Sequence, residues 1–237
     1  MTSSIDNRRA LKARAASLVL PQGFVFGAAT AAYQIEGAPA EDGKGESIWD
    51  RFCKVPGVII DGSSGAIACD SYHRWKDDIA VLKELGLSAY RFSFAWTRLM
   101  PEGRGAMNAK GVAFYDRLID DLLAAGIEPY ATLYHWDLPR ALQDEGGWYN
   151  RATADALADY AALAARSFGD RVKKWTTLNE PWTFCWSGHA SGEDAPGLRD
   201  GTKGGVTASH HALLGHGKAV PAIRAEGPDA SVGIVFD

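Results

Sequence analysis

The run Thr176-Thr177-Leu178-Asn179-Glu180-Pro181 places an amide and a carboxylic acid side by side where an apolar stretch ends. Neighbouring residues on a regular strand face opposite sides, so both can serve one site only where the strand bends, which Pro181 favours. In such a bend the acid could donate a proton and the amide could hydrogen-bond a substrate hydroxyl. The alternative reading is that Asn179 and Glu180 only complete a loop.

Two other predicted strand ends carry polar side chains. The run Tyr134-His135-Trp136-Asp137-Leu138-Pro139 closes one strand, and its His135 could bind a hydroxyl, act as a general base, ligate a metal or serve only the structure. The run Tyr33-Gln34-Ile35-Glu36-Gly37-Ala38 follows the first predicted strand, where the Gln34 amide could contact two adjacent hydroxyls or cap a turn. The eight tryptophans of the chain could stack on sugar faces or pack in the core.

Two patterns near the C-terminus look like a metal site and a phosphate-binding loop, but their spacing does not fit either. The spacing of His210, His211 and His216 matches neither the two-histidine helix motif of zinc enzymes nor a facial triad, so no metal is expected. The run Gly201-Thr202-Lys203-Gly204-Gly205 lacks the spacing of a phosphate-binding loop, and a flexible loop is predicted there.

The composition is that of an ordinary globular protein. The 237 residues are 46% hydrophobic and 23% charged, which fits one large domain or two small ones. The net charge is −4, and no basic stripe favours a nucleic-acid partner. Cys53, Cys69 and Cys185 match no zinc or disulfide spacing and indicate a reducing compartment.

The N-terminus and the hydropathy pattern bear on where the protein resides. Residues 1–20 form a predicted N-terminal extension, in which basic residues precede an apolar stretch too short for a typical export signal. No apolar run approaches the roughly 18 residues that a membrane-spanning helix needs. We therefore expect a cytoplasmic protein that does not contact a membrane.

Apolar runs alternate with amphipathic stretches along the chain. Strands are predicted at residues 24–29, 89–94, 127–136, 172–178 and 231–236. Helices are predicted around residues 72–85, 112–123, 157–169 and 206–226. Pro221 is expected to kink or restart the last helix.

This alternation indicates parallel βα units of the α/β class, arranged either as a doubly wound sheet or as a (β/α)8 barrel. No dinucleotide or Walker motif is present, and the polar side chains gather at strand ends, where barrel enzymes place their chemistry. The barrel is favoured, with residues 21–237 supplying only about the first four to five units, a half-barrel. Because a half-barrel leaves open strand edges and an uncovered apolar face, we expect a partner, either a C-terminal half-chain or a second copy.

Five motifs follow one another in a single order: Phe26-Gly27-Ala28-Ala29-Thr30-Ala31-Ala32-Tyr33-Gln34-Ile35-Glu36-Gly37, Ser47-Ile48-Trp49-Asp50, Tyr90-Arg91-Phe92-Ser93, Thr132-Leu133-Tyr134-His135-Trp136-Asp137-Leu138-Pro139 and Thr177-Leu178-Asn179-Glu180-Pro181. Together they resemble glycoside hydrolase family 1, the β-glucosidase and β-glycosidase family. The resemblance covers the chain from about residue 21 to its last residue.

The resemblance implies a retaining enzyme on a (β/α)8 barrel that hydrolyses terminal non-reducing β-D-glucosides or short β-linked oligosaccharides without a cofactor. Retention requires two carboxyl groups about 5–5.5 Å apart. By its motif Glu180 is the general acid/base, and Asn179 binds the sugar 2-hydroxyl. The family's nucleophile lies in a Thr-Glu-Asn-Gly-type motif, which does not occur in this sequence. A sugar-binding or self-associating half-barrel without activity of its own is therefore the alternative.

The resemblance also implies four supporting residues. Gln34 and His135 hold the 3- and 4-hydroxyl region of the sugar, Trp136 lies beside them, and Arg91 lies beneath the nucleophile. The run Glu193-Asp194-Ala195-Pro196-Gly197 departs from the family's usual His-Ala-Pro-Gly, which leaves the leaving-group side of the pocket undefined.

Overall fold

The computed structural model describes residues 17–236, and they contain one parallel sheet whose strand order follows the chain. The strands are β1 (Gly27–Ala29), β2 (Ala89–Ser93), β3 (Glu128–Tyr134), β4 (Lys174–Asn179) and β5 (Ser231–Val235). Each strand pairs in parallel with the next. The predicted succession of parallel βα units is confirmed, and β1 and β5 form the two edges of this sheet.

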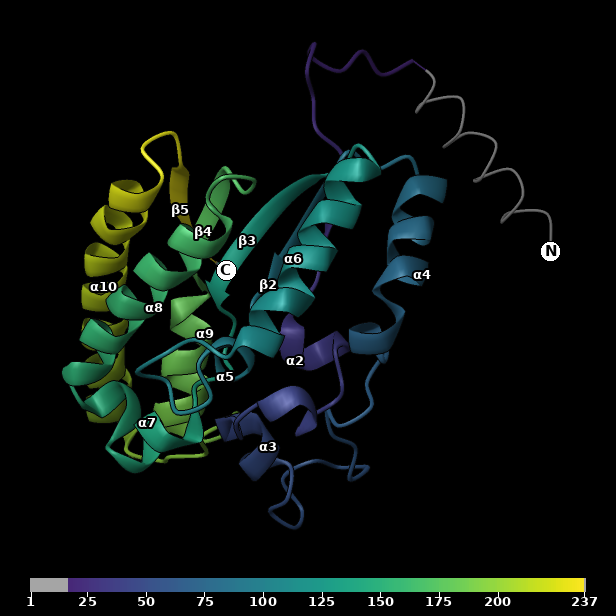
Figure 1. Cartoon of the computed structure of the whole chain (residues 1–237). Coiled ribbons are helices and arrows are strands. Elements are labelled where there is room, and N and C mark those ends of the chain that lie inside the picture. The colour runs from purple at the N-terminus through teal and green to yellow at the C-terminus, as the bar shows by residue number, and fades with distance from the viewer. Residues whose placement is uncertain (1–16, 237) are drawn as a thin grey trace.

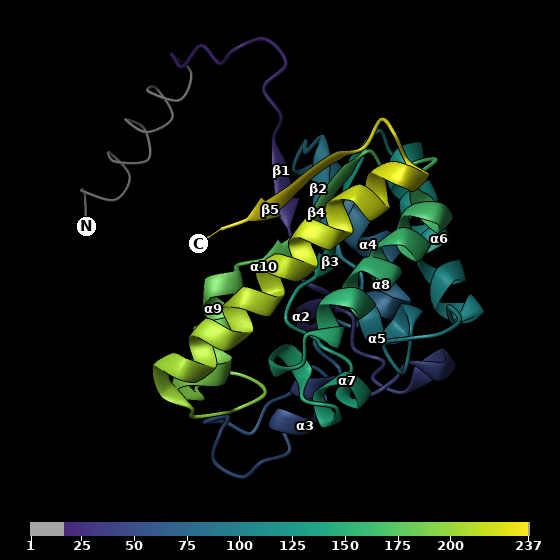
Figure 2. The same ribbon diagram turned by 90° about the vertical axis from the view of Figure 1, so that its left-hand side faces the viewer.

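Four long helices cover one face of the sheet (Figures 1 and 2). They are α4 (Ser71–Glu84), α6 (Ala109–Ala124), α8 (Ala152–Phe168) and α10 (Gly201–Glu226), each preceding the next strand. This arrangement is that of half of a (β/α)8 barrel, as the sequence predicts. None of the helices among the described residues is both long and apolar enough to cross a membrane.

Short helical segments occupy the loops that follow the carboxyl ends of the strands. They are α2 (Ala32–Ile35), η1 (Glu41–Gly43), α3 (Ile48–Phe52), α5 (Trp96–Leu99), α7 (Arg140–Asp144), η2 (Gly147–Tyr149), α9 (Pro181–Trp186) and η3 (Ser187–Ser191). Figure 1 shows α3, α7 and α9 below the strands, at the end opposite the start of β1.

The hydrophobic core lies between the sheet and the long helices and is rich in aromatic rings. Phe94, which directly follows β2, stacks on Phe168 of α8 with ring centroids 4.9 Å apart. Trp96 of α5 stacks on Tyr160 of α8 at 4.8 Å. Such pairs contribute about 0.5–1.5 kcal/mol each beyond the burial of their surface. They fix α8 against the end of β2 and so hold the strand ends in place.

The opposite face of the sheet carries several polar side chains. Alternate residues point away from the helices because side chains alternate along a strand. On β2, β3 and β4 these residues include Arg91, Tyr130, Thr132, Lys174 and Thr176, paired across the strands as their register requires. The hydroxyls of Thr132 and Thr176 lie 2.7 Å apart. This face is therefore suited to polar side chains or a polar ligand.

The first strand is shorter than predicted. Phe24, Val25 and Phe26 lie before β1 and are exposed. The neighbouring strand β2 begins at Ala89, which pairs with Gly27, so Phe24 and Val25 precede the level at which β2 starts. The apolar run predicts a strand, but a residue becomes part of a strand only where a neighbouring strand lies beside it to pair with.

The last helix also differs from its prediction. Residues 201–205, predicted as a flexible loop, form its first turns, where Gly205 packs against the Trp186 ring so closely that a Cβ would come within 2.9 Å of it. Close packing on Trp186 thus outweighs the low helix propensity of glycine. The helix then continues without a break through Pro221, so the predicted restart is wrong.

Candidate active site at the carboxyl ends of the strands

The end of β4 has the bend that Pro181 predicts. The β4–β5 register is irregular between Thr176 and Asn179, and Glu180 adopts a left-handed conformation with φ 47° and ψ 65°. The Glu180 amide still donates to Val235 of β5 at 2.8 Å. A left-handed residue other than glycine is uncommon and is found where the surrounding structure imposes it. Asn179 is buried, whereas Glu180 is half-buried.

Arg91 of β2 connects this strand end to the middle of the sheet. Its Nη2 donates to Oδ1 of Asn179 at 3.0 Å, so the Asn179 amide nitrogen is left to donate to a ligand. Burial lowers the pKa of Arg91, and the nearby Glu180 carboxylate opposes this effect. Arg91 therefore orients Asn179 and places a positive charge near Glu180.

Trp136 holds the two strand ends together. It follows β3 with a positive φ of 78°, and its indole Nε1 donates to the Asn179 carbonyl at 2.9 Å. Its ring centroid lies 5.5 Å from that of His135. These contacts and charges bring four predicted site residues, together with Glu180, to one end of the sheet: Arg91, His135, Trp136 and Asn179.

His135 is held as a neutral imidazole. Burial, reinforced by the positive charge of Arg91, lowers its pKa from the ordinary 6.5 to about 4. Its Nδ1 is buried without a hydrogen-bond partner. A neutral imidazole has one donor and one acceptor nitrogen, a combination that matches a sugar hydroxyl.

This pKa predicts how stability depends on pH. An unfolded His135 titrates near 6.5 and the folded one near 4, so between these values the unfolded chain binds more protons. The free energy of unfolding therefore falls as the pH drops, and the His135 contribution falls by about 2 kcal/mol between pH 7 and pH 5. Urea unfolding of the wild type and of His135→Gln at both pH values measures it. Equal pH dependence in the two proteins would contradict a buried neutral His135.

Gln34 lies at the same end of the sheet but apart from these contacts. It belongs to α2, which begins shortly after β1, and its side chain is exposed. The end of β1 is tied to β2 because the Thr30 amide donates to the Arg91 carbonyl at 2.9 Å. Gln34 thus follows a segment that is tied to β2, and its exposed side chain is open to a ligand.

A buried ion pair anchors the segment that carries Gln34, and the sequence analysis missed it. Arg98 of α5 is fully buried, and its Nε donates to the Glu36 carboxylate at 2.9 Å. The Tyr115 hydroxyl donates to the other Glu36 oxygen at 2.5 Å. The Arg98 guanidinium also lies over the Tyr72 ring at 3.9 Å from its centroid. Glu36 belongs to the same motif as Gln34, so the sequence could have drawn attention to it. Its partner Arg98 lies 62 residues away and could not be predicted from the sequence.

Residues 193–197, where the sequence differs from the family's usual motif, pack against the start of η3, which directly follows α9. The Asp194 amide donates to the Ser187 carbonyl at 3.2 Å, and Gly188 lies against Ala195. Burial raises the pKa of Asp194, and the neighbouring Glu193 raises it further. This loop therefore brings Glu193 and Asp194 close to the end of α9.

The three histidines of α10 do not converge. The Nδ1 atom of His211 lies 2.9 Å from the Trp148 carbonyl, and that of His216 lies 2.7 Å from the Thr177 hydroxyl. Over residues 17–236 no group of three or more His, Cys, Asp or Glu side chains is arranged to hold a metal ion.

Comparison with known proteins decides the family. Residues 16–237 match the family described as glycosyl hydrolase family 1. The chain belongs to this family. It is 51% identical to β-glucosidase A of Thermotoga maritima over 92% of its own length and 48% of that relative. It is also 51% identical to β-glucosidase A of Acetivibrio thermocellus, over 93% of this chain and 49% of the relative.

Solved structures of family 1 members agree with the fold. The T. maritima β-glucosidase in complex with deoxynojirimycin matches with a TM-score of 0.90 at 51% identity, covering 92% of this chain and 50% of that one. The complex of the same enzyme with noeuromycin matches equally well, with 49% of that chain covered. The chain thus spans about half the length of the family 1 relatives that it matches.

Proposed function

We propose that this chain supplies the proton-donating half of a retaining β-glucosidase site, with Glu180 as the general acid/base. The observation that carries the proposal is the group of contacts around Glu180 in a family 1 chain: Arg91 bonded to Asn179, Trp136 bonded to the same residue, and the charge of Arg91 acting on Glu180. The relatives are β-glucosidases, which supports terminal β-D-glucosides as the substrate class.

In the proposed mechanism Glu180 first protonates the glycosidic oxygen and later takes a proton from the attacking water. Asn179 donates its amide N–H to the sugar 2-hydroxyl, a contact that strengthens in the oxocarbenium-like transition state. Gln34 and His135 hold the neighbouring hydroxyls, and Trp136 lies beside them. Arg91 sits where it would keep a nearby carboxylate nucleophile ionised.

The nucleophile is proposed to come from a segment outside this sequence, since the family's nucleophile motif does not occur in it. A C-terminal half-chain of the same family fits this role because β1 and β5 are the edges of the described sheet. The proposed half-barrel comprises residues 21–237 and is preceded by an extension at residues 1–20. A cytoplasmic location stays a prediction. Residues 1–16 lie outside the described part of the chain.

Mixing experiments test this proposal. The chain is combined with the separately produced C-terminal half of T. maritima β-glucosidase A, and turnover of p-nitrophenyl β-D-glucoside is measured. We expect activity in the mixture that depends on both components. A fused chimera of the two halves that folds, as judged by circular dichroism, and remains inactive would contradict the proposal.

Self-association is the second candidate. It is favoured by the two edge strands and by the exposed Phe24, Val25 and Phe26 beside β1. Light scattering distinguishes the two: a monomer near 25.5 kDa excludes self-association, whereas a dimer supports a pseudo-complete barrel with two Glu180 side chains.

A further inference from the structure

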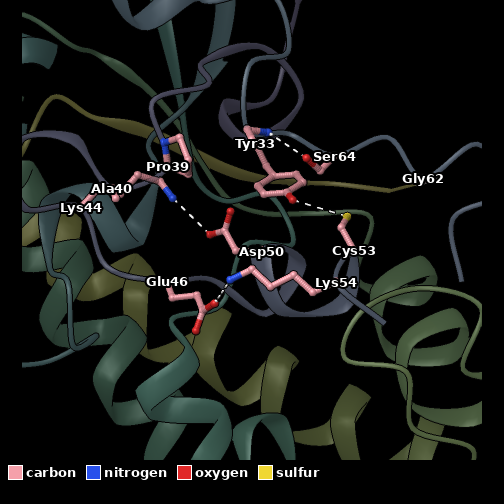
Figure 3. Close-up of a pocket in the computed structure, with 11 residues that line it drawn as sticks. Tyr33, Pro39, Ala40, Lys44, Glu46, Asp50, Cys53, Lys54, Gly62 and Ser64 are labelled. Atoms are coloured by element: carbon pink, nitrogen blue, oxygen red, sulfur yellow. Dashed lines mark hydrogen bonds and ion pairs between the residues drawn. The ribbon is translucent and has the colours of Figure 1, made fainter. Parts of the chain in front are cut away.

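A cavity of about 450 Å³ lies in the loops that follow β1 (Figure 3). Its volume falls within the range typical of small-molecule sites. It is lined by Tyr33, Pro39, Ala40, Lys44, Glu46, Asp50, Cys53, Lys54, Gly62, Ser64 and Ala66. Because every one of these residues lies in the segment 33–66, this segment alone forms the cavity.

The charged groups in the cavity wall neutralise one another. Lys44 pairs with Asp50 at 3.3 Å, and both side chains are largely buried. Lys54 pairs with Glu46 at 2.5 Å, and this hydrogen bond contributes most to holding the pKa of Glu46 below its usual range. Two cations and two anions give the cavity wall no net charge. A neutral ligand that donates and accepts hydrogen bonds can bind to this wall and leave both pairs in place.

An aromatic ring forms one side of the cavity. The Tyr33 hydroxyl donates to the Cys53 sulfur at 3.5 Å, and the Gly65 amide donates to the same hydroxyl at 3.4 Å. Its ring packs against that of Trp49 with centroids 5.9 Å apart. Figure 3 shows the ring among the lining side chains, between Cys53 and Ser64. A fixed ring beside polar groups gives the cavity an apolar surface against which the C–H groups of a pyranose can pack.

A small recess behind the cavity ends at an unsatisfied buried group. Its volume is about 10 Å³, and it shares Tyr33, Pro39, Lys44 and Asp50 with the cavity wall. Asp137 lines the recess, is 2% exposed, and its Oδ1 has no hydrogen-bond partner. The recess holds one water-sized group, and leaving a buried polar atom unpaired costs about 1–3 kcal/mol. A hydroxyl, which both donates and accepts, would satisfy it in either protonation state of Asp137.

We propose that this cavity is a second saccharide site, which binds a neutral monosaccharide with one hydroxyl directed toward Asp137. It shares no lining residue with the proposed catalytic group, namely Gln34, Arg91, His135, Trp136, Asn179 and Glu180. Binding there therefore does not depend on Glu180 or on a partner chain.

Cys53 provides the readout. In the full-length Cys69→Ser variant the exposed thiol is removed, while Cys185 is buried and its pKa is raised to about 12 by burial, so Cys53 is the thiol left to react. We expect D-glucose to slow the reaction of Cys53 with a disulfide reagent by the factor 1 + [L]/Kd, about tenfold at ten times Kd. A rate unchanged by glucose would overturn the proposal.

Paired variants locate the effect. Ser64→Trp fills the cavity and should abolish the dependence on glucose, whereas Ser63→Trp, at the exposed neighbour that does not line it, should preserve it. Asn179→Ala should leave the protection unchanged, and its loss in that variant would assign the protection to the catalytic end instead. Protection by inorganic phosphate as strong as that by glucose would contradict a neutral ligand. The assay needs no turnover, so its failure and that of the proposed function are distinguishable.

Discussion

Replacing Glu180 with glutamine is expected to reduce the activity of the fused chimera by about 10²–10⁴-fold, the usual contribution of a positioned general acid/base. Glutamine preserves the shape of the side chain but has no proton to deliver to the glycosidic oxygen. The half-buried position of Glu180 and the adjacent Arg91 stay in place, so the loss reports proton transfer. The measurement is kcat/KM with an alkyl β-D-glucoside.

The leaving group provides the internal control for this experiment. The leaving group of a 2,4-dinitrophenyl glucoside is 2,4-dinitrophenolate, which departs without protonation. Glu180→Gln should therefore slow the first step of hydrolysis far less for this substrate than for an alkyl glucoside. Glu145→Gln, at an exposed acid that pairs with Arg104, should leave both substrates unaffected. Equal losses with the two leaving groups would rule out Glu180 as the acid.

Replacing Arg98 with methionine is expected to lower the free energy of unfolding by about 3–5 kcal/mol, because it leaves a buried carboxylate without its cation. Glu36 is 5% exposed and receives hydrogen bonds from Arg98 and Tyr115. Only the Tyr115 bond would remain. Urea unfolding followed by circular dichroism measures the change.

The double variant Glu36→Met/Arg98→Met tests the explanation. Replacing both partners of a buried pair by apolar residues of similar volume is often close to neutral, so the double variant should recover much of the stability lost in the single one. A double variant as unstable as Arg98→Met would show that the loss comes from packing against Tyr72 and not from the unpaired charge.

Local signals predicted the strands well. β2, β3 and β4 begin and end within two residues of their predicted bounds because apolar runs there are delimited by glycine, proline or polar residues. The failures have long-range causes: Phe24 and Val25 lack a neighbouring strand, and residues 201–205 become helical because Gly205 packs on Trp186. Neither cause can be recognised from the residues nearby in the sequence.

In the candidate site, too, local features could be predicted from the sequence and long-range contacts could not. The residues at strand ends could be named from the sequence because parallel strands bring their carboxyl ends to one edge. Their couplings could not, since Arg91 and Asn179 are 88 residues apart and Glu36 and Arg98 are 62 apart. The left-handed conformation of Glu180 also arises from the irregular pairing of β4 with β5. The sequence thus indicates which residues take part, and the packing decides how they are oriented.

The central claim is that this chain carries the proton donor and needs a nucleophile from elsewhere. The most direct test is turnover of p-nitrophenyl β-D-glucoside by the purified 237-residue chain alone. We expect no turnover above background until a family 1 C-terminal half is added, and slower turnover with that half when Glu180 is glutamine. Rapid hydrolysis by the chain alone, with retention at the anomeric carbon, would contradict the account.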